Sequence, residues 1–132
     1  MAPAQAALFD GMPAAEQRHG LDVVADLRAG GSTDCELLIA GLLHDCGKDP
    51  RVRLVHRVAL SLGQRYGTWI WRASRHLPTF RTGLAILRDH TERSAELAAA
   101  AGCTARTIEL IRNQEAPTDD AGRLLLAADE AN

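Results

Sequence analysis

The apolar run from Leu37 to Leu43 ends in two polar residues, and this junction constrains the fold more than any other stretch of the chain. The run is rich in large aliphatic side chains, which indicates a mostly buried helix. His44 and Asp45 follow it directly. Buried polar side chains need partners, and a divalent metal ion binds both an imidazole and a carboxylate. We therefore expect the pair to end a buried helix and to face a metal ion in the interior.

The composition favours helices. The chain has 132 residues, of which 46% are hydrophobic and only 4% are aromatic, so Leu, Ala, Val and Ile must form the core. This composition, with few β-branched runs, is typical of helical proteins, and no segment indicates a strand. The length suits one compact domain. We therefore expect an all-α fold, a single compact helical bundle over residues 1–132.

Gly, Pro and capping residues divide the chain into predicted helices. One helix is expected from about Pro13 to Ala29. The next is expected to begin at a capping box in which Thr33 is the cap and Glu36 its partner, and to end near Cys46. Further helices are expected over residues 50–66, 79–88, 90–101, 104–114 and around 124–129.

The spacing of apolar residues predicts which polar side chains face the interior. His19 shares a helical face with Val23 and Leu27, and Asp129 lies one turn after Leu125. Together with the central pair, four metal-ligating groups are thus expected to point inward from three helices that are distant in sequence. Helical bundles build metal sites in this way, and two imidazoles with two carboxylates suit Mn, Fe, Co, Ni or Zn.

Charge is unevenly distributed along the chain. The net charge is −2, yet residues 50–88 contain eight arginines and no acid, while the remainder carries all 17 acidic residues against seven basic ones. Such a segment attracts nucleic acid or another anionic surface, or it forms a solvated helix face that balances the acidic remainder. Both interpretations of the basic segment stay open. Assembly of the chain into a homo-oligomer is also possible on the sequence alone.

Other features point to a cytoplasmic protein. No apolar stretch approaches the length of a membrane span, and the N-terminal residues lack the basic start and apolar core of a secretion signal. The three cysteines show no metal-type spacing and cannot all pair with one another. Reduced thiols are therefore expected.

The order His, His-Asp, Asp resembles that of the HD-domain superfamily of metal-dependent phosphohydrolases. Residues 38–48, with the sequence LIAGLLHDCGK, resemble the LLHDIGK signature of that family. Residues 17–24 resemble its first-histidine helix, and residues 126–129 its last aspartate segment. The resemblance extends from Gln17 to Asn132. It implies an HD-type bundle with a metal-binding core over about 13–48 and 89–132 and a basic helical segment over 50–88.

Roles for single residues follow from this resemblance. His19, His44, Asp45 and Asp129 would be the metal ligands. Asp45 would also orient the nucleophile or accept its proton, Lys48 would meet a substrate phosphate, and His90 would protonate the leaving group or hold a phosphate oxygen. For Lys48 the other interpretation is an exposed lysine that is favourable beyond a helix end.

One metal ion per chain is expected. Some relatives bind a second metal through extra histidines, and here Asn113 and Gln114 stand where a histidine pair would be. Amide oxygens are poor partners for a transition metal beside imidazole. His56 and His76 are expected to lie outside the metal site, and Cys46 to be a small buried residue.

The expected function is hydrolysis of a phosphate ester or phosphoanhydride, in a phosphorylated small molecule such as a nucleotide, by a metal-activated water. Two alternatives stay open. One is a non-catalytic HD-type module that binds an anionic partner through the basic segment. The other is an HD-type diiron oxygenase, although that chemistry requires the full set of ligands for a second metal.

Overall fold

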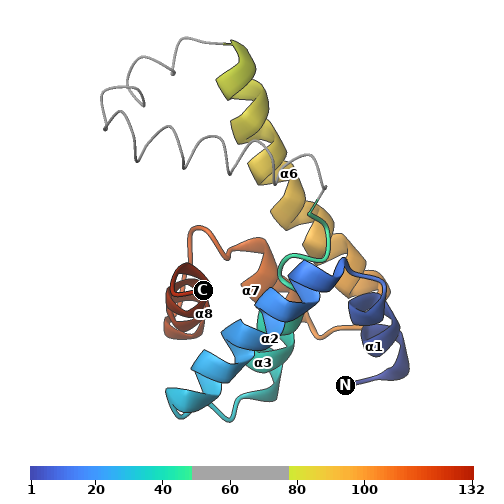
Figure 1. The fold of residues 1–132 in the computed structure, drawn as a ribbon, viewed down its shortest axis with the longest axis vertical. Coiled ribbons are helices and arrows are strands. Elements are labelled where there is room, and N and C mark those ends of the chain that lie inside the picture. The colour runs from blue at the N-terminus through green and yellow to red at the C-terminus, as the bar shows by residue number, and fades with distance from the viewer. Residues whose placement is uncertain (49–77) are drawn as a thin grey trace. The chain divides into compact units, whose positions relative to one another are not determined.

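A computed structural model describes the backbone of residues 1–48 and 78–132 and the side chains of residues 1–48 and 89–132. Every regular element in these residues is an α-helix, which confirms the all-α prediction for the described part of the chain. That the bundle is of the HD type stays a prediction. The helices are α1 (Pro3–Asp10), α2 (Ala14–Ala29), α3 (Cys35–Leu43), α6 (Pro78–Ala100), α7 (Ala105–Arg112) and α8 (Asp120–Glu130) (Figure 1).

The chain divides into two compact units. One comprises Met1–Gly47 with Thr91–Asn132, and the other Lys48–His90. The first unit contains four of the predicted site residues, which are His19, His44, Asp45 and Asp129. The helix predicted over 50–66 and the residues His56 and His76 lie outside the described part. None of the described helices combines the length and the apolarity needed to cross a bilayer.

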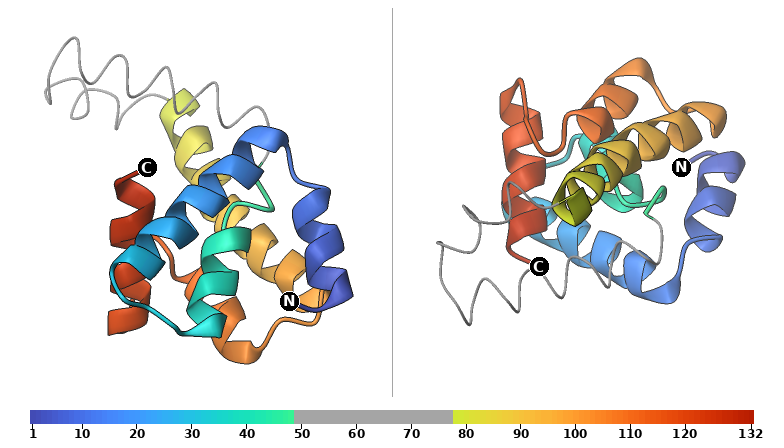
Figure 2. Two further views of the ribbon diagram at one scale, coloured as in Figure 1. Left: turned by 60° about the horizontal axis from the view of Figure 1, so that its bottom comes forward. Right: turned by 90° about the horizontal axis from the view of Figure 1, so that it is seen from above.

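Helix α3 is the central element of the first unit. It packs against α1, α2, α7 and α8, and Figure 2 shows it between α2 and α7. A helix in this position must be apolar on nearly all sides, which explains the sequence CELLIAGLL. The largest fully buried apolar side chains come from α2, α3, α7 and α8, and they are Val23, Leu37, Leu43, Ile111 and Leu125. Burying each one stabilises the fold by about 1.5–3 kcal/mol.

Helices α2 and α3 approach each other closely beside His19. A Cβ atom on Gly20 would lie only 2.8 Å from the carbonyl oxygen of Leu42. Only glycine permits this backbone-to-backbone contact. The residue next to His19 therefore sets the distance between the helix that carries this histidine and the helix that leads to His44.

The ends of the helices differ in several places from the sequence prediction. The cap of α3 is Asp34, whose carboxylate accepts hydrogen bonds from the backbone N–H groups of Glu36 and Leu37. The prediction of Thr33 as the cap was therefore wrong, because the aspartate one residue later occupies the extended cap position. The predicted break between 79–88 and 90–101 was also wrong: α6 is continuous, since no Gly or Pro interrupts it near residue 90.

Helix α1 was not predicted. Pro3 occupies its first turn and Gly11 its C-terminal cap, a combination typical of helix ends that could have indicated it. The side-chain amide of Gln17 donates hydrogen bonds to the carbonyl oxygens of Phe9 and Met12, both at 3.1 Å. This side chain fixes the corner between α1 and α2, two residues before His19.

Candidate metal centre

The structure brings together the His and Asp side chains that the sequence predicted to face inward. His19 lies in the second turn of α2, Asp129 in the last turn of α8, and His44 and Asp45 immediately after α3. One ligand atom from each of His19, His44 and Asp45 lies within 4.8 Å of the others. These three residues form a group that could hold a metal ion.

Asp129 completes the group from the C-terminal helix. Its Oδ1 atom lies 2.7 Å from His19 Nε2 and 3.2 Å from His44 Nε2. The Oδ2 atom of Asp45 lies 3.8 Å from His19 Nε2 and 3.6 Å from His44 Nε2. Two imidazole nitrogens therefore face two carboxylates across a space of a few ångströms.

A backbone contact fixes the ring of His44. Its Nδ1 atom lies 2.9 Å from the carbonyl oxygen of Gly41. A carbonyl only accepts hydrogen bonds, so Nδ1 must carry a hydrogen and donate it. This bond directs Nε2 toward the two carboxylates, which is how proteins orient an imidazole for metal binding. The rings of His19 and His44 are tilted by 57° with centroids 5.2 Å apart.

The electrostatics of the group favour a positive charge between the carboxylates. Burial disfavours the charged form of His44, but the hydrogen bond to Asp129 and the charges of Asp45 and Asp129 outweigh it and raise the pKa of this histidine. Burial likewise disfavours ionised Asp129, yet the hydrogen bonds from His19 and His44 bring its pKa far below the ordinary value. The ionised carboxylate of Asp129, within hydrogen-bond distance of both imidazoles, attracts a cation.

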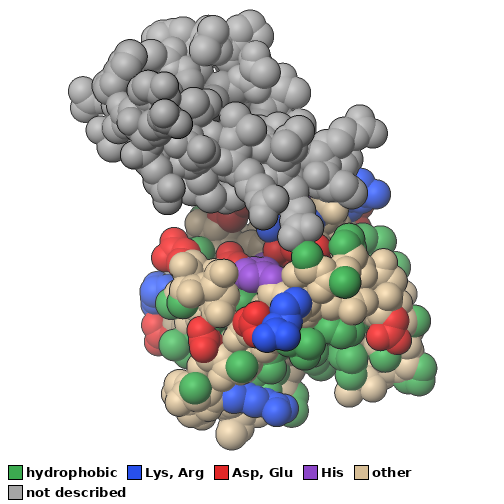
Figure 3. All heavy atoms as spheres, viewed as in Figure 1, with side chains coloured by type: hydrophobic (Ala, Val, Ile, Leu, Met, Phe, Trp, Pro, Cys, Tyr) green, Lys and Arg blue, Asp and Glu red, His purple; other side chains and the backbone are tan. Residues whose placement is uncertain are grey.

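One side of the group is accessible to solvent. His44 and Asp45 expose only 2% and 5% of their side chains, whereas His19 and Asp129 expose 23% and 36%. Figure 3 shows histidine atoms at the molecular surface with acidic side chains close by. The candidate site is therefore open to solvent on the side of His19 and Asp129.

The stretch that carries His44 and Asp45 is a turn and not a helix. The prediction that this helix continues to about Cys46 was wrong: α3 ends at Leu43, and residues 44–47 form turns. Two buried side chains that the sequence did not single out for this purpose contact the turn, Ser94 of α6 and Gln114 after α7. Nothing in the local pattern around Ser94 indicates this contact, because it joins residues 47 positions apart.

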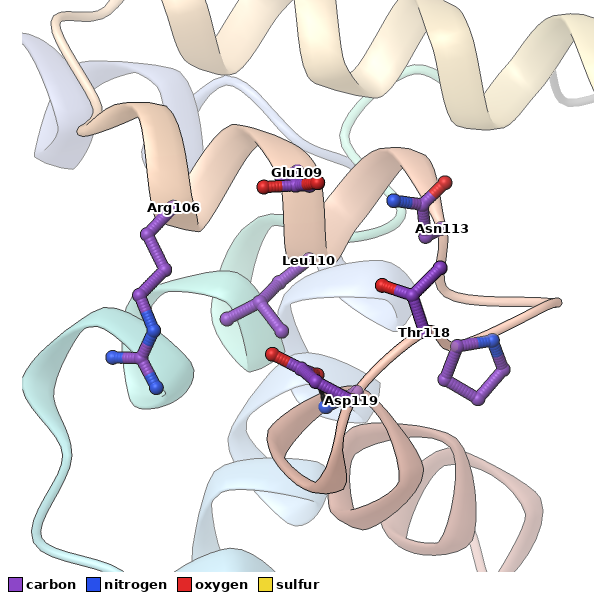
Figure 4. A pocket seen from close by; sticks show the side chains of 8 residues that line it. Arg106, Glu109, Leu110, Asn113, Thr118 and Asp119 are labelled. Carbon is purple, nitrogen blue, oxygen red and sulfur yellow. Dashed lines mark hydrogen bonds between the residues drawn. The ribbon is translucent and has the colours of Figure 1, made fainter.

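The two amides predicted to replace a histidine pair point to different places. Gln114 is buried, and its Nε2 atom donates to the carbonyl oxygen of His44 at 3.4 Å. Asn113 lines a hollow of about 70 Å³ between α7 and the start of α8 (Figure 4). Only Gln114 therefore reaches the turn of the candidate site.

Two further predicted site residues, Lys48 and His90, belong to the second compact unit. His90 is buried, with 7% of its surface exposed. Their catalytic roles stay predictions. Cys46 is half-buried, and burial raises the pKa of its thiol to about 11, so it stays protonated at neutral pH.

Comparisons of the chain with protein-family models, with curated proteins and with solved structures gave no match.

Proposed function

We propose that this chain is a metal-dependent phosphohydrolase of the HD type, which cleaves a phosphate ester or a phosphoanhydride. The observation that carries the proposal is the convergence of His19, His44, Asp45 and Asp129 from three distant parts of the sequence. Burial of His44 and Asp45 costs solvation, which a bound cation would compensate. The match between their order and the HD pattern adds the class of reaction.

The donor set fits a first-row transition metal. Two imidazole nitrogens and two carboxylate oxygens suit Mn, Fe, Co, Ni or Zn better than they suit Mg or Ca, which prefer oxygen alone. His44 would bind the metal through Nε2 after losing the proton on that nitrogen, since Nδ1 donates to the Gly41 carbonyl. We expect one metal ion per chain.

Such an ion would lower the pKa of a water molecule and polarise a phosphoryl oxygen. Asp45, the more buried carboxylate, would orient the attacking water and accept its proton. His19 and Asp129 form the exposed edge, through which a substrate would enter. The HD-type resemblance would assign Lys48 to a substrate phosphate, and His90 to protonating the leaving group or holding a phosphate oxygen.

The test combines metal analysis with a substrate screen. Purified protein is analysed for bound metals and assayed with Mn²⁺, Fe²⁺, Co²⁺, Ni²⁺ or Zn²⁺ against nucleotides, sugar phosphates and an aryl phosphate. Asp45→Ala is expected to lose bound metal and to lower turnover at least ~10³-fold, since the metal supplies several kcal/mol of transition-state stabilisation. Its circular dichroism should remain helical.

Asp22→Asn is the matched control. Asp22 lies on α2 in an exposed ion pair with Arg18, so its variant should keep full metal content and turnover. Wild-type turnover by Asp45→Ala would refute the assignment of the centre. Two irons per chain with oxygen-dependent turnover would instead favour the oxygenase. A bound metal without any turnover, together with tight binding of nucleic acid or anionic vesicles, would favour the binding module.

A further inference from the structure

The turn that carries His44 and Asp45 is held in part by its own backbone, since the N–H of Cys46 donates to the carbonyl oxygen of Leu43 at 3.0 Å. Residues 44–47 lie beyond the last residue of α3. Backbone groups past the end of a helix lack intrahelical partners and must find others. The positions of both candidate ligands therefore depend on the end of α3 and also on the elements against which this turn packs.

Ser94 of α6 holds the C-terminal end of the turn. Its hydroxyl oxygen accepts a hydrogen bond from the backbone N–H of Gly47 at 2.9 Å. Its carbonyl oxygen accepts a weaker one from the thiol of Cys46 at 3.5 Å. The serine has no exposed surface, so water cannot take the place of the hydroxyl.

The turn and α6 touch at the backbone. A Cβ atom on Gly47 would come within 2.6 Å of the Ser94 nitrogen and 2.9 Å of its hydroxyl oxygen. No side chain fits there. The hydroxyl of Ser94 thus meets the N–H of Gly47 directly, two residues after Asp45.

A serine is not needed for packing at this position. The neighbouring buried residues of α6, Ala95 and Ala98, are alanines without exposed surface. Alanine is the better helix former, and a buried hydroxyl must be compensated by a hydrogen bond. The hydrogen bond from the Gly47 N–H provides that compensation, which explains why a serine and not an alanine occupies this position.

We propose that Ser94 is a positioning residue of the metal centre: its hydroxyl, through Gly47, holds the turn so that Asp45 and His44 face His19. Gln114 supports the same turn at its start, through the carbonyl of His44. The inference rests on the proposed metal site. Ser94 acts through the backbone and touches neither metal nor substrate.

Titration of the full chain with Co²⁺ tests this, because the visible spectrum of Co²⁺ reports the ligand geometry. Supporting groups around metal ligands are typically worth 10–100-fold in affinity. We expect Ser94→Ala to bind Co²⁺ about 10-fold more weakly and with an altered spectrum. In urea, its unfolding midpoint should fall only modestly.

Thr107→Val is the matched control. Thr107 is 1% exposed, and its hydroxyl donates to the carbonyl oxygen of Glu36 at 3.3 Å. This bond supports the opposite end of α3. The variant should lose a similar amount of stability and keep the affinity and the spectrum of the wild type.

A second pair of variants tests the contact between Ser94 and Gly47 by changing the glycine. Gly47→Ala should push the turn away from Ser94 and weaken Co²⁺ binding at least as much. In Gly30→Ala a Cβ atom meets only ordinary contacts at 3.5 Å, and binding should not change. If Ser94→Ala does not fold, the comparison of Gly47→Ala with Gly30→Ala tests the role of this contact.

The outcomes separate the two proposals. If the wild type binds none of the five metals, the proposed function fails, and this inference fails with it. If the wild type binds Co²⁺ and Ser94→Ala or Gly47→Ala binds it equally well with the same spectrum, only the role of Ser94 is refuted. Equal loss in Ser94→Ala and Thr107→Val would also refute it, since the effect would then be one of general stability.

Discussion

Gly20 offers a sharp test of how α2 and α3 set the distance between His19 and His44. Alanine in place of glycine inside a helix normally stabilises a protein by about 1 kcal/mol. Here the added Cβ atom would lie 2.8 Å from the carbonyl oxygen of Leu42 and 3.3 Å from its Cα atom. Both are backbone atoms, so the contact can be relieved only by moving one helix.

The expected sign is therefore the reverse of the helix propensity. Overpacking of a tight interior costs about 1–3 kcal/mol, so Gly20→Ala should lower the free energy of unfolding by about 0–2 kcal/mol after the propensity gain. At roughly 4 °C per kcal/mol, the melting temperature falls by up to about 8 °C. Co²⁺ affinity should fall as well, because His19 moves with α2.

Gly41→Ala is the comparison, since it lies on the other side of the same helix interface. Its Cβ atom would meet side-chain atoms of Leu27, Val23 and Val24 at 3.2–3.4 Å, and those side chains can rotate away. We expect a smaller loss of stability than for Gly20→Ala, measured by urea unfolding and thermal scans. If Gly20→Ala stabilises the protein as an exposed helical glycine would, the close approach of the two helices is wrong.

Two further predictions concern other parts of the first unit. Burial raises the pKa of Asp34, but Arg106 and the backbone N–H groups of Leu37 and Glu36 outweigh it and lower this pKa below its ordinary value. The cap therefore stabilises the fold above the pKa of the unfolded chain, near 3.8, and this contribution is lost as the pH falls through the folded-state pKa. Asp34→Ala should cost about 1 kcal/mol in urea unfolding at pH 7 and much less at pH 2; an equal cost at both would contradict the ionic part of the cap. The thiol of Cys46, with its pKa raised to about 11 by burial, should react with a thiol reagent only on unfolding, whereas exposed Cys35 reacts at once; fast labelling of Cys46 in the folded protein would refute its placement.

The helices of this protein could be predicted from the sequence where they depend on local features such as apolar periodicity and capping residues. The period of apolar residues predicted α2 and placed His19 on the same face as Val23 and Leu27. Both of these apolar side chains are buried in the structure. The helix predicted over 104–114 is α7, and Thr104 is its N-terminal cap. These features depend on neighbours within one or two helical turns, so the sequence contains all the information that they require.

The order of the four candidate metal ligands could likewise be predicted from the sequence, and the helical period indicated that they face the interior. Only the tertiary structure decided how they meet: Asp129 of α8 lies against both imidazoles, and His44 and Asp45 stand on a turn and not on a helix. That turn is shaped by Ser94 and Gln114, which are 47 and 70 positions away from their partners in the chain. Contacts of such long range leave no periodic mark on the sequence, because they depend on the packing of whole helices and not on the preferences of neighbouring residues.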